Sequence, residues 1–216
     1  MAAVETVQGL RAAKKRETHD AIASAATRLF MQRGFEDVTI AEIAAAARVA
    51  KMTVTNYFPR KEDLALDRHE ELVSAVAAPV ERRAPGESVL AAARAGYAAR
   101  LATRDPTLGF SSVEWAGMLF GSRALRARLR EIHEQAEDAL ARVLAEQTGD
   151  AGLTPRLVAA QLVATERLLL TEALRRSLAG EGADQVYAAL AEASREAFER
   201  LERGLGDYGL DTAQSD

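Results

Sequence analysis

The 216-residue sequence has no cysteine, only 5 prolines and few aromatic residues, which make up 5% of the chain. The absence of cysteine excludes disulfide bonds, thiolate metal sites and cysteine redox sensing. No apolar run approaches the length of a membrane span, and the N-terminus lacks a signal-peptide pattern, so we expect a soluble cytoplasmic protein. What the chain does contain, mainly Ala, Leu, Arg and Glu, favours an all-α fold.

Charge is unevenly distributed along the chain. The net charge is −4, but residues 1–61 hold 10 Lys or Arg and 6 Asp or Glu, which leaves −8 on the remainder. A basic N-terminal segment on an acidic body fits binding of a polyanion through one end, although unrelated proteins share this asymmetry. We expect residues 1–10 to be frayed. The basic run at residues 11–16 fits either a phosphate-contacting arm or a solvated helix end.

Residues 39–57 carry two short helical patterns separated by a tight break at Arg48 and Val49. The first begins with Thr39 and, three residues later, Glu42, the spacing of a capping box. Small apolar residues follow on one face and allow a second helix to cross closely. The second pattern, residues 50–57, displays short polar and cationic side chains that can bind base edges or phosphates in a major groove. An ordinary capped pair of surface helices would explain any one of these residues, but not the set.

The string AATRLFMQRGFEDVTIAEIAAAARVAKMTVTNYFPRKEDL resembles the N-terminal DNA-binding domain of TetR-family transcriptional regulators. The shared features are a first helix that ends in Gly-Phe, a Thr-capped Ile-Ala helix, and the Tyr-Phe-x-x-Lys-Glu-x-Leu closure. Two positions depart from the family pattern. Arg48 stands where the family usually has Gly, and it costs about 1 kcal/mol if its φ is positive. Ala50 stands where the family often has Ser, which removes a side-chain cap worth about 1 kcal/mol.

The resemblance implies an all-α protein with a three-helix head that carries a helix-turn-helix, and a C-terminal helical bundle. We expect the DNA-binding domain over residues 1–60 and an effector-binding and dimerisation domain over residues 61–216. It also implies a homodimer that places two recognition helices in successive major grooves of a palindromic operator. The residues expected near bases are Lys51, Thr53, Thr55 and Asn56, with Met52 on a thymine methyl or simply packed; those expected on phosphates are Thr39, Tyr57 and Lys61.

Beyond the head, the pattern predicts a connector helix to about residue 78, a break at Pro79 and Pro85-Gly86, and a helical bundle. We expect bundle helices over residues 87–103, 106–120, 122–148, 154–179 and 183–205. The resemblance implies that the last two pair with their copies in a partner subunit. Burial within one subunit would explain the same apolar positions: Leu157, Ala160, Ala164, Leu168, Val186, Leu190, Ala193, Ala197 and Leu201.

Aromatic and soft side chains gather between residues 97 and 120, where the resemblance implies an effector pocket. The candidate pocket residues are Tyr97, Phe110, Glu114, Trp115, Met118 and Thr165, with Glu166 as a further polar candidate. Core packing and a solvated helix face would explain each of them singly.

Catalytic and metal-binding patterns are lacking. The sequence has no Gly-x-Ser-x-Gly elbow, no His pair at metal-ligand spacing and no glycine-rich phosphate loop, so we expect neither enzymatic activity nor a cofactor. We predict a ligand-responsive repressor that binds DNA as a dimer and is released by a small lipophilic or acyl-thioester effector. The alternatives are a DNA-binding or architectural dimer without effector sensing, and an all-helical enzyme with an appended helix-turn-helix.

Overall fold

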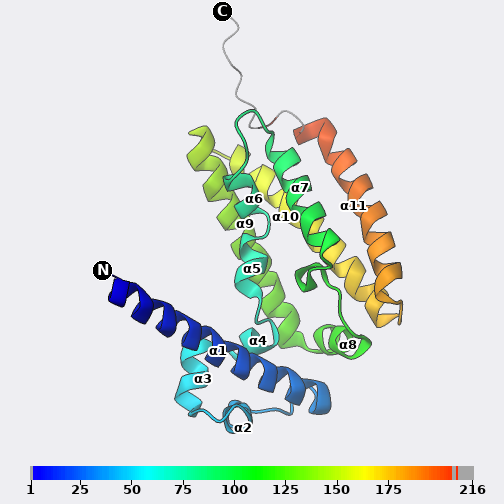
Figure 1. The fold of residues 1–216 in the computed structure, drawn as a ribbon. Coiled ribbons are helices and arrows are strands. Elements are labelled where there is room, and N and C mark those ends of the chain that lie inside the picture. Colours follow the sequence, from blue (N-terminus) through cyan, green and yellow to red (C-terminus); the bar gives the residue numbers. More distant parts are fainter. Residues whose placement is uncertain (1, 206–207, 209–216) are drawn as a thin grey trace, which may run out of the picture. The chain divides into compact units, whose positions relative to one another are not determined.

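The computed structural model describes residues 2–205 and 208, with side chains from residue 13 onward, and the regular elements in this part are all helical (Figure 1). The prediction of an all-α fold is therefore confirmed. Contacts divide the chain into two compact units. The first holds the residues up to Asp67 together with Met118–Arg126; the second holds Arg68–Gly117 and the residues from Ala127 onward. No helix in the described part is both long and apolar enough to cross a membrane.

The first unit contains α1 (Ala2–Arg33), α2 (Ile40–Ala46), α3 (Lys51–Tyr57) and α4 (Lys61–Ala65). Helix α1 packs on α2 and α4, and α2 packs on α3 (Figure 1). Buried apolar side chains from the four helices and from the segments between them form the core: Ile22, Ala26, Phe30, Phe35, Val38, Ile43, Val54, Phe58 and Leu64. Burial of these groups is the main favourable term in folding. It therefore fixes the packing of α2 on α1 and of α3 on α2, although both helices are short.

The sequence predicts the C-terminal end of α1 correctly but not its N-terminal end. Gly34 ends the helix as predicted, with φ at 88° and its N–H donating to the Phe30 carbonyl at 2.8 Å. Residues 2–10, which we expect to be frayed, are instead helical, because α1 begins at Ala2; residue 1 lies outside the described residues. A helix already anchored by its buried part extends without a new nucleation step, and each added residue gains a hydrogen bond.

A second stretch of chain completes the first unit. Residues 118–126, from the end of α8 (Val113–Gly121) into α9 (Arg123–Thr148), pack with it. Leu119 and Leu125 are buried, and the Ser122 hydroxyl donates to a Glu36 carboxylate oxygen at 2.7 Å. The first unit is therefore discontinuous in sequence.

The predicted connector helix over residues 60–78 is wrong as a single element. Three short helices replace it: α4, α5 (His69–Ser74) and α6 (Ala77–Glu81). Leu66 leaves the helical region, with φ at −110° and ψ at 49°, while its side chain is buried. The predicted break at Pro79 is also wrong, because Pro79 lies in the first turn of α6, where a helix needs no backbone donor.

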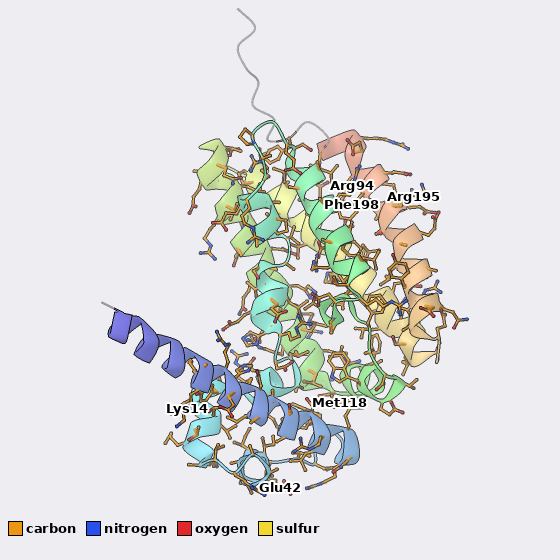
Figure 2. The ribbon with its side chains drawn as sticks, in the orientation of Figure 1. Lys14, Glu42, Arg94, Met118, Arg195 and Phe198 are labelled. Carbon is orange, nitrogen blue, oxygen red and sulfur yellow. The ribbon has the colours of Figure 1, made fainter. Side chains whose placement is uncertain are left out.

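The second unit also contains α7 (Val89–Ala102), the 3-10 turn η1 (Pro106–Leu108), α10 (Thr154–Leu178) and α11 (Ala183–Leu205). Helix α11 packs on α7 and α10, and Arg94 on α7 lies beside Phe198 on α11 (Figure 2). The Arg94 guanidinium donates to the Phe198 carbonyl at 3.4 Å. The Tyr97 and Phe198 rings, 5.9 Å apart, lie in the core between these helices.

Two glycines allow close approaches in the second unit. A Cβ on Gly96 of α7 would lie 2.5 Å from Cγ of Pro79, so only glycine lets α6 and α7 pack this closely. Gly109, with φ at 92°, divides the predicted helix over residues 106–120 into η1 and α8. A Cβ there would lie 2.9 Å from the Leu170 carbonyl oxygen, so the chain turns here against α10.

Candidate functional site

The start of α2 is held by a hydrogen-bonded cluster of Arg33, Thr39 and Glu42 (Glu42 is labelled in Figure 2). The Thr39 hydroxyl accepts from the Glu42 N–H at 3.3 Å, and the Thr39 N–H donates to the Glu42 carboxylate at 2.8 Å. The predicted capping box is therefore confirmed. The Arg33 guanidinium donates to the same carboxylate at 2.7 Å and, with the Thr39 hydrogen bonds, lowers the pKa of Glu42 to about 2.

This cluster also occupies the Thr39 side chain. The Thr39 hydroxyl donates to Glu42 Oε2 at 2.8 Å, so a phosphate that accepts from this hydroxyl has to replace Glu42 as its partner. The role of Thr39 on a phosphate stays a prediction. The role of the cluster in joining the end of α1 to the start of α2 was not visible in the sequence, because Arg33 and Glu42 are nine residues apart.

The turn between α2 and α3 is strained at one residue. Arg48 has φ at 56°, in the left-handed region that favours glycine, and the following Val49 N–H donates to the Ala44 carbonyl at 3.0 Å. Ala50 begins α3 without a side-chain hydrogen bond. Both departures from the family pattern therefore have the predicted consequence, which is a positive φ at Arg48 and the lack of a side-chain cap at Ala50.

Helix α3 stands on a buried base and presents polar groups above it. Val54 and Phe58 are fully buried, whereas Lys51 and Asn56 are exposed and the Met52 side chain is 70% exposed. Thr53, Thr55 and Tyr57 are half-buried. Residues three and four apart share a helix face, so Met52 lies beside Thr55 and Asn56. Such a face can enter a groove of duplex DNA and meet base edges, because its outward groups both donate and accept hydrogen bonds.

Besides Thr39, two of the predicted contact residues already have partners within the unit. The Thr55 hydroxyl donates to the Met52 carbonyl at 3.1 Å, which leaves its oxygen as an acceptor. The Lys61 ammonium donates to the Glu36 carbonyl at 3.2 Å and lies 4.4 Å from the centre of the Phe35 ring. Lys61 therefore fixes the start of α4, and a phosphate contact by this side chain stays a prediction.

The basic run before the core of α1 is helical. Lys14, labelled in Figure 2, is exposed, as are Lys15 and Arg16. The Arg11 side chain lies outside the described residues. The exposed cations fit both sequence interpretations, a phosphate-contacting segment and a solvated helix.

The six predicted pocket residues differ in how deeply they are buried. Tyr97 is buried against α11, Glu114 is exposed, and the other four are half-buried: Phe110, Trp115, Met118 and Thr165. The Thr165 hydroxyl donates to the Gln161 carbonyl one turn earlier, at 2.8 Å. Their role as effector contacts stays a prediction.

A cavity of about 20 Å³, room for one water molecule, lies in the second unit among α5, α7, η1, α9 and α10. None of the six predicted residues lines it, but Glu166, the further candidate, does. Its polar lining also includes Arg100 and His133. Arg100 and Glu166 form an ion pair in which their side chains are only 16% and 12% exposed. Sequence reasoning missed Arg100 and His133; the signal for Arg100 is its position three residues after Tyr97 on an Ala-rich helix.

The groups at this cavity have shifted pKa values. Burial raises the pKa of the Glu166 carboxyl, and the neighbouring Arg100 opposes that rise. Burial, with a smaller contribution from Arg167, lowers the pKa of His133 to about 4, so its imidazole is neutral at pH 7. Tyr97 does not line the cavity, but its ring lies beside Arg100, and burial raises the pKa of its hydroxyl well above the usual value.

Three buried polar atoms at the cavity or beside it have no hydrogen-bond partner of normal geometry within the described residues: Arg100 Nε, His133 Nδ1 and the Tyr97 hydroxyl oxygen. The Leu129 carbonyl favours the protonated His133 ring, but its geometry falls short of a hydrogen bond. A buried polar atom without a partner is unfavourable by about 1–3 kcal/mol. The site therefore has unused capacity to bind a polar group.

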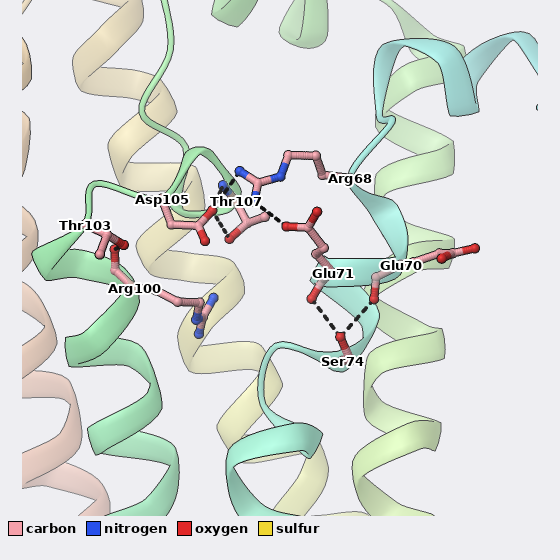
Figure 3. Close-up of polar contacts among 8 residues, drawn as sticks. All are labelled: Arg68, Glu70, Glu71, Ser74, Arg100, Thr103, Asp105 and Thr107. Carbon is pink, nitrogen blue, oxygen red and sulfur yellow. Dashed lines mark hydrogen bonds and ion pairs between the residues drawn. The ribbon is translucent and has the colours of Figure 1, made fainter. Parts of the chain in front are cut away.

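A polar network runs from the start of the second unit to the wall of this cavity (Figure 3). Arg68 pairs with Glu71 and, at 3.1 Å, with Asp105, which accepts from the Thr107 N–H at 2.8 Å. Burial would raise the pKa of the Asp105 carboxyl, but these hydrogen bonds and the nearby arginines hold it below its usual value. Thr107 lines the cavity. Polar contacts therefore connect the wall of the cavity to Arg68, the first residue of the second unit.

Helix α10 has an apolar stripe on its exposed side. Leu157 and Leu168 are 50% and 61% exposed, Leu178 is 42% exposed, and Ala164 lies half-buried between them. On α11, by contrast, Val186 and Leu190 are buried within the subunit, so they are not available to a partner.

Comparisons with known proteins agree with this architecture. The sequence model for bacterial regulatory proteins of the tetR family matches residues 22–67. Over 172 residues the chain is 31% identical to the HTH-type transcriptional regulator TcmR of Streptomyces glaucescens, with 76% of each chain covered.

Among solved structures, the chain is similar in fold to SmeT in a complex with triclosan, with a TM-score of 0.56, 16% identity, and 93% of this chain and 97% of that chain covered. It is also similar to native NalD, the secondary repressor of the MexAB-OprM multidrug efflux pump in Pseudomonas aeruginosa. There the TM-score is 0.52, the identity is 19%, and the coverage is 84% of this chain and 97% of that chain. At these identities the likeness concerns the fold alone.

Proposed function

Because the chain belongs to the TetR family of bacterial regulatory proteins, and is thus a DNA-binding transcriptional regulator, we propose that it acts as a homodimeric repressor released by a small molecule. The observation that carries the DNA-binding proposal is the exposed face of α3 above its buried base. Lys51, Met52 and Asn56 extend from this face, and Thr53, Thr55 and Tyr57 border it. We assign Lys51, Thr53, Thr55 and Asn56, with Met52, to base edges, and Thr39, Tyr57 and Lys61 mainly to phosphates.

The test is selection of a binding site from a random duplex library with the full-length protein, followed by anisotropy measurements on the selected duplex. A palindrome with half-sites about one helical turn apart is expected. Asn56→Ala should relax base preference, whereas Lys61→Met should weaken binding to all sequences alike and reduce the salt dependence by about one phosphate contact. If Lys61 serves only to fix α4, its substitution lowers stability and leaves the salt dependence unchanged.

The homodimer proposal rests on the apolar stripe of α10. Exposed leucines recurring along one face of a helix favour burial against another chain. Leu168→Asp should shift the protein toward monomer in sedimentation velocity and weaken operator binding. Val113→Asp is the matched control, since Val113 is also an exposed apolar residue, 44% exposed, but lies on α8. Equal effects of the two substitutions would contradict an α10 interface.

Release by an effector is supported by the polar cavity in the second unit and by the solved SmeT complex with triclosan, a protein of similar fold. A ligand in the cavity would displace Leu72 on α5 and Val76 shortly after it. Helix α5 is the first helix after the first unit in the chain. Only a difference in ligand affinity between the DNA-binding and released states can shift their balance. Operator anisotropy across a panel of lipophilic and acyl-thioester compounds tests this; if no compound changes it, release fails while DNA binding stands.

A second candidate function is a DNA-binding dimer that senses no effector. The small volume of the cavity favours it, whereas the unpartnered buried groups around the cavity favour a sensor. A rise in melting temperature with an added compound separates the two, because a ligand stabilises only the state that binds it. Membership in a family of regulators does not support the enzyme alternative.

A further inference from the structure

The walls of the cavity are mainly apolar. Leucine and valine side chains from α5, the N-cap of α6, η1 and α10 contribute most of them: Leu72, Val76, Leu108, Val163 and Leu170. A ligand for this site therefore needs an apolar body.

The charged groups at the cavity already balance one another. Arg100 and Glu166 form a buried ion pair, and burial favours the neutral form of His133. Arg167 adds a positive charge, but its side chain is exposed, where water screens it. A carboxylate or phosphate placed beside Arg100 would therefore meet the Glu166 carboxylate in a region of low dielectric, where like charges repel strongly. The site is unfavourable for an anion.

An uncharged oxygen meets a different environment. Within the described residues the Arg100 Nε–H donor has no hydrogen-bond partner, because the ion pair with Glu166 uses Nη2. The guanidinium lies 5.6 Å from the centre of the Tyr97 ring. His133 Nδ1, also shielded from solvent, adds a second polar atom at the same wall. A hydroxyl or carbonyl oxygen can accept from Arg100 without bringing a charge near Glu166.

We propose, on the basis of the effector function above, that this cavity binds an uncharged, mainly apolar molecule whose hydroxyl or carbonyl oxygen accepts a hydrogen bond from Arg100. The same pairing of Arg100 with Glu166 excludes carboxylates and acyl thioesters that carry phosphates. This inference selects the lipophilic class over the acyl-thioester class among effectors.

The cavity has to widen for such a molecule, and α5 is the wall that can move. This helix has six residues and none of them is buried, so few apolar contacts hold it in place. Leu72 and Ala75 form the part of the wall that α5 and its C-cap provide. Displacement of α5 would disturb the Arg68 pairs with Glu71 and Asp105 shown in Figure 3.

Two probes that share a naphthalene frame and one acyl thioester test the proposal by titration calorimetry on the full-length protein without DNA. They are 2-naphthol, which is uncharged at pH 7, 2-naphthoate, which is an anion, and hexanoyl-coenzyme A. We expect 2-naphthol to bind at least about tenfold more tightly than either anion, the scale of one charge-assisted hydrogen bond in a buried site. Glu166→Gln should reverse the order of 2-naphthol and 2-naphthoate, because the carboxylate then meets Arg100 alone. Glu172→Gln, which removes a half-exposed partner of Arg176 on the same helix, is the matched control and should keep the wild-type order.

A double variant keeps the test decisive if Glu166→Gln does not fold. Arg100→Met with Glu166→Leu replaces the ion pair by apolar groups, an exchange that proteins often tolerate, and it should bind 2-naphthol no better than naphthalene. The proposal is overturned if the wild-type protein prefers an anion, if the double variant keeps the preference for the hydroxyl, or if no probe binds. Operator anisotropy on the same samples shows independently whether the DNA-binding function stands.

Discussion

Replacing Arg48 by glycine should stabilise the first unit, because Arg48 has φ at 56° in the turn between α2 and α3. The left-handed conformation costs an L-residue about 1–2 kcal/mol, whereas glycine adopts it without this penalty. Glycine also loses more backbone freedom on folding, which offsets about 0.4–1 kcal/mol of that gain. The expected increase in the free energy of unfolding is therefore about 0.5–1 kcal/mol.

Urea unfolding followed by circular dichroism measures the global effect, and amide hydrogen exchange in α3 measures it locally. A gain of 1 kcal/mol raises the melting temperature of a protein of this size by about 2–4 °C. The control is Arg48→Ala, which removes the guanidinium but keeps Cβ and thus the strain. If alanine stabilises the unit as much as glycine does, the guanidinium and not the backbone set the cost, and the reasoning is refuted.

Three further predictions follow from local geometry. Gly96→Ala should destabilise the second unit by about 1–3 kcal/mol in urea unfolding, since its Cβ would overlap the Pro79 ring, whereas Gly117→Ala, with its nearest neighbour at 3.7 Å, should not; a harmless Gly96→Ala would contradict the close packing. Because the pKa of Glu42 falls from 4.5 to about 2 on folding, its ionised form adds stability above pH 4.5 that is lost as the pH falls toward 2. The stability difference between Glu42→Gln and the wild type should therefore shrink from pH 7 to pH 3, and a constant difference would exclude this role. Ala50→Ser should add an N-cap to α3 and raise the free energy of unfolding by about 1 kcal/mol, measured as a higher urea midpoint; an unchanged midpoint would show that the start of α3 is already satisfied.

The end of α1 and the start of α2 were predictable from the sequence, because the residues that specify them lie close together in the chain. A Thr followed three residues later by Glu specifies the start of α2, and Gly34 specifies the end of α1 by the conformation that it alone adopts easily. The positive φ of Arg48 was predictable only through the family resemblance, since no local rule places an arginine there.

The polar cavity was not predictable, because tertiary packing alone brings its charges together. Arg100, His133 and Glu166 come from α7, α9 and α10, and the helical pattern does not distinguish a buried charged head from one that reaches solvent. The division of the connector into α4, α5 and α6 was missed for a related reason. No glycine or proline marks the break at Leu66, whose side chain turns into the core of the first unit.

The return of residues 118–126 to the first unit means that the DNA-binding part of this protein is not a detachable module. A fragment that stops at Asp67 would lack Leu119 and Leu125 and would leave Glu36 without the Ser122 hydroxyl. Chimaeras that exchange the first unit between relatives therefore need to carry the α8–α9 junction along with the N-terminal segment.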